Sequence, residues 1–126
     1  MDSQGAETIV NVPEAGHIHW ADFGPTFGTE QSGRRPAVVV SGHGFNVHSP
    51  RIIVCPVTSR TLDWPVVVPI PTSLRTQGVI LCDQIRAIDR RARLFQFIEI
   101  LPMEQLIEVR RVLSAILEIP ALSSGT

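Results

Sequence analysis

The chain has 126 residues, of which 44% are hydrophobic and 18% charged, and its formal net charge is −1. This length favours a single globular domain, and no apolar run approaches the roughly 18 residues that a membrane-spanning helix needs. The first residues show neither the basic nor the apolar segment of an export signal, so we expect a cytoplasmic protein with no membrane partner.

Charge and cysteine are unevenly placed along the chain. Residues 1–33 contain acidic residues and no arginine or lysine, whereas residues 34–93 are rich in arginine and poor in acidic residues. A nearly neutral chain can therefore present a basic surface to an anionic partner. Cys55 and Cys82 both lie in apolar runs, which is typical of buried reduced thiols, and the sequence leaves a disulfide open.

The ends of the chain differ from its middle. Residues 1–13 lack hydrophobic periodicity and are expected to form a loose arm. Residues 14–120 are expected to form one domain, because they contain no internal repeat and no linker. Residues 121–126 are expected to be a frayed tail.

The first part of the domain has the pattern of β-strands. Alternation predicts a strand over 16–23, with His17 and His19 on a solvated face rather than in a metal site. Residues 24–34 hold three glycines and a proline, which predict a loop. A second strand is expected over 36–41, and the segment 42–50 is rich in turn-forming residues.

The later elements are strands followed by one helix. Strands are expected over 51–58, 65–70, 78–82, 85–88 and 94–100, with a connector over 71–77. Pro56 indicates an edge or a bulge in the strand over 51–58. A helix is expected over 102–118, where Pro102 suits the first turn and Pro120 marks the stop. Its apolar stripe consists of Leu106, Val109, Leu113 and Ile116.

Strand direction predicts where the polar loops meet. If consecutive strands pair antiparallel, the loop over 24–34, the end of the strand at Thr58 and the segment 83–86 share one end of the sheet. The segments 42–50 and 71–77 then lie at the opposite end. The residues expected to converge are Glu30, Arg35, Thr58, Asp83 and Arg86.

A dense motif runs through the first loop and its flanking strands. Its residues are Gly16, Ile18, Trp20, Asp22, Pro25, Thr26, Gly28, Glu30, Gln31, Gly33, Arg35 and Pro36, and further matches cover 55–59 and 82–89. In this register nearly the whole chain resembles the MazF/PemK/Kid family of toxin endoribonucleases. The resemblance implies a mainly β fold, namely a small SH3-like or CcdB-like twisted antiparallel barrel with a C-terminal α-helix, which forms a homodimer.

The resemblance also implies a reaction. Members of the family cleave single-stranded RNA at specific sequences without a metal or other cofactor, and the 2′-hydroxyl attacks its own phosphate. The catalytic arginine of the family falls at Arg35 and its partner threonine at Thr58. A guanidinium stays ionised and can hold two phosphate oxygens, and a hydroxyl can donate to one. Proton removal is left to Glu30, Asp83 or water.

Further polar residues are expected to bind the substrate: Gln31, Arg34, Ser59, Asp83, Gln84 and Arg86. For Asp83 and Arg86, an ion pair that pins the turn is an equally open interpretation, and for Arg34 a solvated loop charge is the favoured one. Kid-type relatives carry a histidine and an arginine where this chain has Thr29 and Leu81. That difference argues against a His/Arg/Asp scheme.

The resemblance implies a protein partner as well, and two rival functions remain. The expected partner is a cognate acidic antitoxin that covers the basic end of the sheet. One rival is a CcdB-like toxin of the same fold, which acts on gyrase through a C-terminal Trp-Gly-Ile motif. This chain ends in residues 122–126 without that motif. The other rival is an SH3-like module with no activity.

Overall fold

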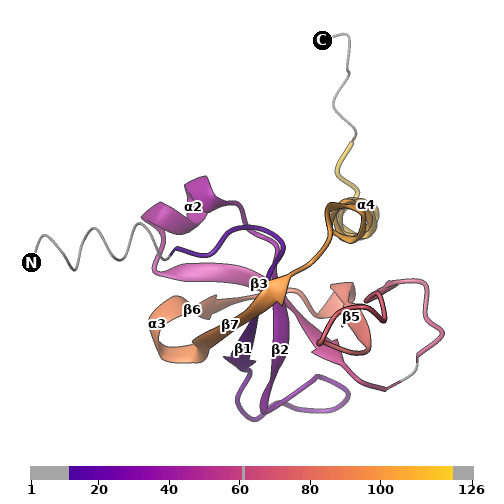
Figure 1. Cartoon of the computed structure of the whole chain (residues 1–126), viewed down its shortest axis with the longest axis horizontal. Helices are drawn as coiled ribbons and strands as arrows, with labels where there is room; N and C mark the ends of the chain where they lie inside the picture. The colour runs from indigo at the N-terminus through magenta and orange to yellow at the C-terminus, as the bar shows by residue number, and fades with distance from the viewer. Residues whose placement is uncertain (1–11, 61, 121–126) are drawn as a thin grey trace, which may run out of the picture.

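The computed structural model describes residues 12–60 and 62–120 as one antiparallel sheet with a long helix packed beside it (Figure 1). The strands are β1 (His17–Asp22), β2 (Arg34–Val39), β3 (Arg51–Thr58), β4 (Val67–Pro69), β5 (Val79–Leu81), β6 (Arg86–Asp89) and β7 (Leu94–Ile100). The helices are α2 (His43–His48), the 3-10 turn η1 (Cys82–Gln84), α3 (Arg90–Arg93) and α4 (Met103–Leu117). None of these helices is both long enough and apolar enough to cross a membrane.

The sheet follows the order β4-β5-β3-β2-β1-β7. The remaining strand, β6, pairs with the first half of β3, while β5 pairs with the end of β3. The mainly β fold with a C-terminal helix is confirmed, but within the described ranges the sheet does not close into a barrel. Hydrogen bonds instead connect β7, at one edge of the sheet, to the connector between β4 and β5, at the other edge. Glu99 on β7 accepts hydrogen bonds from the backbone nitrogens of Arg75 (3.1 Å) and Thr76 (2.6 Å) and from the Thr76 hydroxyl (2.7 Å).

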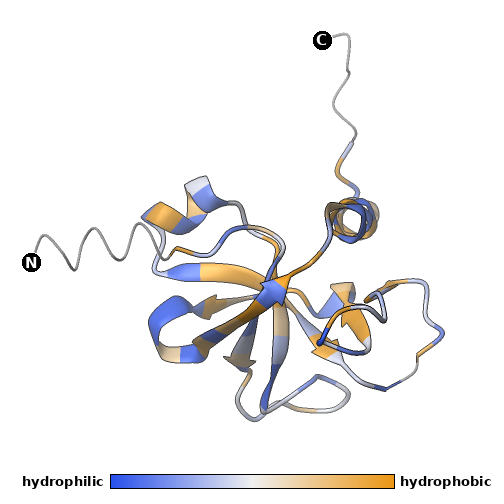
Figure 2. Cartoon of the chain, viewed as in Figure 1, coloured by the Kyte–Doolittle hydropathy of each residue, from blue (hydrophilic) through white to orange (hydrophobic). Residues whose placement is uncertain are grey.

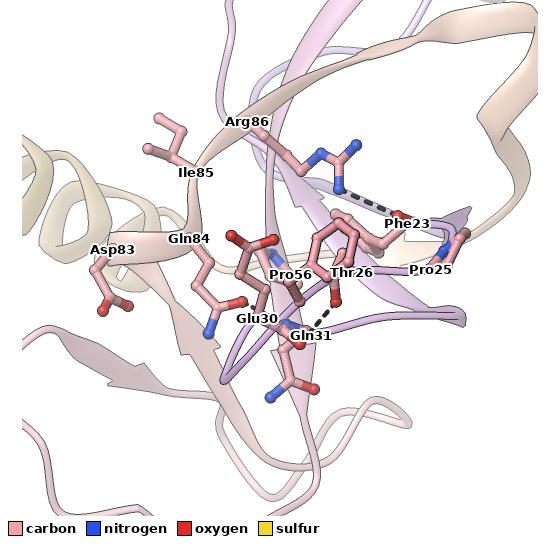
Figure 3. Close-up of a pocket in the computed structure, with 11 residues that line it drawn as sticks. Phe23, Pro25, Thr26, Glu30, Gln31, Pro56, Asp83, Gln84, Ile85 and Arg86 are labelled. Atoms are coloured by element: carbon pink, nitrogen blue, oxygen red, sulfur yellow. Dashed lines mark hydrogen bonds between the residues drawn. The ribbon is translucent and has the colours of Figure 1, made fainter.

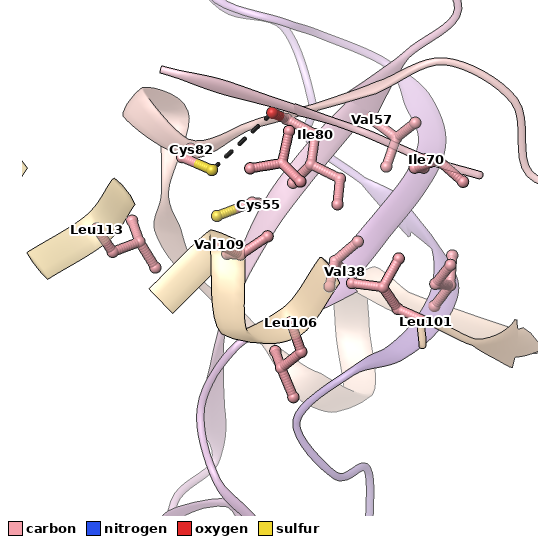
Figure 4. Close-up of a cluster of buried hydrophobic side chains, with 12 residues drawn as sticks. Val38, Cys55, Val57, Ile70, Ile80, Cys82, Leu101, Leu106, Val109 and Leu113 are labelled. Atoms are coloured by element: carbon pink, nitrogen blue, oxygen red, sulfur yellow. Dashed lines mark hydrogen bonds between the residues drawn. The ribbon is translucent and has the colours of Figure 1, made fainter. Parts of the chain in front are cut away.

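The core lies mainly between the sheet and α4. Figure 2 shows hydrophobic residues along the strands and a hydrophilic α3 turn. On α4, Leu106, Val109 and Leu113 follow the spacing of one helix face and pack toward Cys55 and other residues of the sheet (Figure 4). Burying such a side chain stabilises the fold by about 1.5–3 kcal/mol. Three residues of the predicted stripe are therefore core, whereas the fourth, Ile116, is 39% exposed.

The order of the strands corrects the expected directions of β4 and β5. β3 pairs with β5 rather than with β4, because the link from Thr58 to Val67 skips one strand position. β5 is antiparallel to β3 and begins beside Thr58, where Val79 is its partner. The connector over 71–77 consequently lies at the same end as Thr58, not at the opposite end as expected.

Pro56 lies in a central strand and not at an edge. It pairs in register with Ala37 and is fully buried. On the other side of β3, β6 pairs with residues 51–54 and β5 pairs with residues 57–58. The missing N–H of Pro56 therefore falls in the gap between two partner strands, where neither strand needs it.

Two further segments differ from the sequence expectation. Residues 42–50 contain the short helix α2, which is anchored by the buried Asn46: its amide donates to the carbonyls of Pro13 (2.9 Å) and Ser41 (3.0 Å). Of the arm expected over 1–13, residues 1–11 lie outside the described residues, and Val12 and Pro13 are buried. The tail expected over 121–126 also lies outside them.

His19 also differs from the sequence expectation, which placed it on a solvated face. The β1–β7 register shifts on both sides of His19, and the side chain is buried rather than solvated. Its Nδ1 donates to the Phe95 carbonyl at 2.9 Å, and its Nε2 is buried without a hydrogen-bond partner in the described structure. Burial lowers the pKa of His19, which favours the neutral imidazole.

Candidate functional site

Two neighbouring cavities hold most of the polar residues that the sequence singled out. The loop cavity, about 450 Å³, lies between the loop over 24–33 and η1, and the arginine cavity, about 530 Å³, lies between β2 and the connector over 71–77. The two cavities meet at the end of the loop, because Arg35 of the second cavity donates to the carbonyl of Ser32, and Ser32 follows Gln31 of the first. Both sizes fall in the roughly 300–1,000 Å³ range of ligand pockets.

Hydrogen bonds hold the loop above its cavity (Figure 3). At the base of the loop, the Gly33 nitrogen donates to the Gly24 carbonyl at 3.0 Å, and both glycines have positive φ angles that suit residues without a Cβ. Near the tip, the Gln31 nitrogen donates to Gln84 Oε1 at 2.7 Å. The amide of Gln84 thus connects the loop to η1, two segments far apart in the sequence.

The charged residues of the loop cavity are Glu30, Asp83 and Arg86. Arg86 donates from Nη1 to the Phe23 carbonyl at 3.2 Å, and its guanidinium lies 5.6 Å from the centre of the Phe23 ring. Across residues 12–60 and 62–120, Asp83 and Arg86 form no ion pair with each other, so that alternative is not the arrangement seen. Arg86 instead secures the strand that leads into the loop.

Arg35 lies in the arginine cavity and is held by the backbone on two sides. Its Nε and Nη2 donate to the Ser32 carbonyl at 3.2 and 3.1 Å, and its Nη1 donates to the Val57 carbonyl at 3.3 Å. These bonds use three of the five guanidinium N–H groups and leave one on Nη1 and one on Nη2. Burial lowers the pKa of Arg35, but an arginine starts so far above neutrality that the charge remains.

Two more arginines line the same cavity. Arg34 is exposed, and its guanidinium carbon lies 3.9 Å from the centre of the Phe95 ring, so it stacks on β7 rather than standing free in solvent. Arg75 donates from Nη2 to the Ile98 carbonyl of β7. Three positive side chains around one cavity create a site that favours a phosphate group.

Thr58 lies beside this cavity but is only 2% exposed. Its Oγ1 accepts a hydrogen bond from the Arg60 nitrogen at 3.3 Å, and its hydroxyl hydrogen remains available to donate. Ala37 of β2 pairs with Pro56 of β3. Continued by two residues, the same antiparallel register brings Arg35 opposite Thr58. A Cβ on Gly78 would lie 2.0 Å from the Thr58 carbonyl oxygen, so Gly78 allows the close approach of β5.

Neither a thiol nor a metal cluster stands out at the site. In the described part of the chain, no three His, Cys, Asp or Glu side chains gather where they could hold a metal ion. Cys55 and Cys82 are buried in the core, unpaired by a disulfide. A hydrogen bond with Cys82 and burial raise the pKa of the Cys55 thiol, which keeps this thiol protonated.

The expected site residues are thus divided between the two cavities. Glu30, Gln31, Asp83, Gln84 and Arg86 line the loop cavity; Arg34, Arg35 and Ser59 line the arginine cavity; and Thr58 lines neither. Sequence reasoning assigned no role to three further residues that line the cavities, Trp20, Phe27 and Arg75. Arg75 was missed because the connector over 71–77 was expected at the other end of the sheet. The resemblance did mark Trp20, but without assigning it a role.

Comparison with known proteins places the chain in a family. A model of the PemK-like, MazF-like toxins of type II toxin-antitoxin systems matches residues 14–117. The endoribonuclease toxin MazF of Escherichia coli strain K12 is 40% identical over 82 residues, which cover 65% of this chain and 73% of the relative. The endoribonuclease PemK of Escherichia coli is 38% identical over 109 residues, with 82% and 81% covered.

Solved structures agree in fold. The crystal structure of MazF (Form-I) from Deinococcus radiodurans matches with a TM-score of 0.80 and 41% identity over 86% of this chain and 98% of that one. A MazE-MazF crystal structure (Form-II) from the same organism matches with a TM-score of 0.76 and 40% identity, with the same coverage. The chain belongs to the PemK-like, MazF-like toxin family of type II toxin-antitoxin systems.

Proposed function

We propose that this chain is an endoribonuclease toxin that cleaves single-stranded RNA at specific sequences by attack of a 2′-hydroxyl on the adjacent phosphate, without a metal or other cofactor. Family membership supports the activity, since the relatives are named endoribonucleases. It also favours this function over a CcdB-like, gyrase-binding one. The observation that carries the proposal is Arg35, which keeps two N–H groups free in a cavity lined by two further arginines.

In the proposed reaction the scissile phosphate occupies the arginine cavity. The 2′-oxygen forms a bond to phosphorus, the bond from phosphorus to the 5′-oxygen breaks, and the 2′-hydroxyl proton passes to Glu30, Asp83 or water. The departing 5′-oxygen takes a proton from water. The two free N–H groups of Arg35 neutralise the charge that grows on the phosphate oxygens, and this kind of contact is often the largest single contribution to catalysis.

Thr58 has a smaller role in this scheme. Its hydroxyl orients a phosphate oxygen, and because the side chain is buried, the phosphate has to reach it past Arg35 or after a small opening of the strand end. A neutral hydroxyl contributes less than a charged guanidinium. Thr58→Ala should therefore lower the cleavage rate by less than Arg35→Ala does.

The substrate is single-stranded for a geometric reason. The attacking 2′-oxygen must lie in line with the leaving 5′-oxygen, and the A-form duplex holds the ribose away from that arrangement. We also propose a cytoplasmic location, where such RNA is available as substrate. A duplex should resist cleavage while its isolated strand is cut, and equal cleavage of both would contradict this part of the proposal.

We also propose an acidic antitoxin segment that covers the arginine cavity. A Deinococcus radiodurans relative has been crystallised with MazE, which supports a partner of this kind. An acidic segment would present carboxylates where RNA presents phosphates, so its affinity should fall with added salt and with Arg35→Ala. Binding that is indifferent to both would contradict charge mimicry.

A homodimer through β7 completes the proposal. β7 ends the sheet, and its Phe97 and Ile100 side chains are 50% and 61% exposed, which is unusual for large apolar residues of a strand. Light scattering at micromolar concentration should give twice the mass of the chain, and Ile100→Asp should lower it. A wild-type monomer would contradict the dimer.

The proposed activity is tested by mapping cuts on a long RNA in the presence of EDTA. Wild-type protein should cut at a small set of sites with a shared short sequence, and Arg35→Ala should leave the RNA intact over the same time. Arg111→Ala is the matched control, because Arg111 lies on α4 and pairs with Glu108 away from both cavities. An RNA left intact by wild-type protein, or cleavage that requires magnesium, would overturn the proposal.

A further inference from the structure

Phe27 is an apolar side chain held almost wholly in water. It is 90% exposed, although it lines the loop cavity. Two hydrogen bonds hold the loop around it, since the Glu30 nitrogen donates to the Phe27 carbonyl at 3.4 Å and the Thr26 hydroxyl to the Glu30 carbonyl at 3.0 Å. Gly28, next to it, has a φ of 65° and nothing within 4 Å of an added Cβ, so the loop tip projects from the domain.

The two cavities differ in charge. The arginine cavity is lined by Arg34, Arg35 and Arg75, whereas the loop cavity is lined by Glu30 and Asp83 together with an arginine that is already bonded to Phe23. Carboxylates repel a phosphate, but they accept hydrogen bonds from the exocyclic amino groups of bases. Charge therefore assigns the phosphate to the arginine cavity and a base to the loop cavity.

The two cavities are also neighbours along the path of an RNA strand. They meet at the end of the loop over 24–33, because Arg35 of the arginine cavity donates to the carbonyl of Ser32, and Ser32 follows Gln31 of the loop cavity. A nucleotide whose phosphate lies at Arg35 can thus place an adjacent base in the loop cavity. Proteins commonly bind an unpaired base of single-stranded RNA by stacking it on the flat face of an aromatic side chain.

We propose that Phe27 is a specificity-determining residue that stacks on an unpaired base next to the scissile phosphate, and that the base edge meets the polar groups of the loop cavity. This inference rests on the proposed endoribonuclease function. It predicts that Phe27 governs RNA affinity and the base preferred at one position of the cut site, whereas Arg35 governs the rate of the chemical step.

The test compares Phe27→Ala, Phe27→Leu and Phe27→Tyr with wild-type protein. Binding is measured by fluorescence anisotropy with short random-sequence 2′-O-methyl RNA, which lacks the attacking hydroxyl, and cuts are mapped on a long unmodified RNA. Phe27→Ala should weaken binding by about 5- to 150-fold, the range for losing one stacked base. It should raise KM, change kcat little and relax one base of the cut motif.

The other variants separate stacking from simple apolar contact. Phe27→Tyr keeps a flat ring and should bind within about two-fold of wild type, whereas Phe27→Leu keeps apolar area without the ring and should stay weak. Phe45→Ala is the matched control, since Phe45 is also an exposed phenylalanine, at 51%, but lies in α2, outside both cavities. Thermal unfolding should be unchanged in all four variants because Phe27 and Phe45 are exposed.

The outcomes distinguish this inference from the proposed function. If wild-type protein cuts RNA and Phe27→Ala binds and cuts like it, stacking is overturned and the endoribonuclease stands. If Phe27→Ala loses RNA binding while wild-type protein cuts nothing, stacking is supported and the nuclease proposal fails. RNA binding by Phe27→Leu that is as tight as binding by Phe27→Tyr would overturn stacking. So would a Phe27→Ala variant that binds RNA normally and loses only the binding of an acidic antitoxin peptide.

Discussion

The Arg35 guanidinium donates from Nη1 to the Val57 carbonyl oxygen at 3.3 Å. This bond fixes the Arg35 side chain, which is predicted to hold the phosphate, next to the end of β3 at Thr58. Two further bonds, from Nε and Nη2 to the Ser32 carbonyl, hold the same group from the loop side. The guanidinium is therefore oriented before any substrate arrives, so little reorganisation is needed at the moment of reaction.

This orientation predicts how Arg35 variants behave. Arg35→Ala should lower the cleavage rate by about 10²-fold or more, the usual scale for deleting a transition-state donor. Arg35→Lys should not restore full rate, because an ammonium lacks the fork that reaches Ser32, Val57 and two phosphate oxygens together. Initial rates at saturating RNA measure this, and a lysine variant with wild-type rate would contradict it.

Arg75 should contribute to RNA binding more than to the chemical step. It lines the arginine cavity from the connector over 71–77, and Arg75→Ala should raise KM and reduce the slope of log affinity against log salt by about one. Arg110→Ala, an exposed arginine on α4, serves as the control and should leave the slope unchanged. Equal slopes for Arg75→Ala and wild-type protein would place Arg75 outside the RNA path.

Gly78 should couple stability to activity. An added Cβ would collide with the Thr58 carbonyl, and the φ of Gly78 is 122°, which strains any other residue. Gly78→Ala should lower the free energy of unfolding by about 1–3 kcal/mol or more and displace Thr58, so that cleavage falls as well. Gly42→Ala has open space and a φ of −76°, and in urea unfolding it should match wild-type protein.

His19 should make stability depend on pH. Burial lowers its folded-state pKa; the bond to the Phe95 carbonyl raises it, and the neighbouring His17 lowers it. The unfolded chain, with a pKa of about 6.5 at this residue, then binds more protons than the folded chain in mild acid. The contribution of neutral His19 is fully present above that pH and is lost as the pH falls through the folded pKa.

The measurement is urea unfolding from about pH 7.5 down to about pH 5.5, where the stability of wild-type protein should decline. His19→Gln should show a weaker decline, because the glutamine does not titrate. His48→Gln, which replaces an exposed histidine of α2, should decline as wild-type protein does. Identical curves for the two variants would show that His19 does not titrate differently on folding.

Local pattern predicted the elements well. The strand expected over 51–58 is found as β3, and the helix expected over 102–118 is found as α4 from Met103 to Leu117, because Pro102 and Pro120 bound it. Strand partners were harder to predict, because pairing is non-local. No residue pattern in the link after Thr58 indicates that the chain passes over the position later occupied by β5. The inward turn of His19 depends on register shifts that leave no local signal.

The candidate site was predictable to the same degree. Arg35 was singled out through a motif that fills most of the first loop, and it lines the arginine cavity, while its role toward a phosphate stays a prediction. Arg75 was not found, because a connector without periodicity reveals its position only once the strand order is known. The separation into two cavities likewise depends on where β5 ends and η1 begins.

The central claim is that Arg35 assists a 2′-hydroxyl in attacking its own phosphate, and the chemical ends of the cut RNA test it most directly. Fragments made by wild-type protein in EDTA should carry a 2′,3′-cyclic phosphate and a 5′-hydroxyl, as read by mass spectrometry. An RNA with 2′-deoxyribose at the cut should bind and stay whole. Fragments with a 5′-phosphate, or cleavage of the 2′-deoxy substrate, would contradict the account.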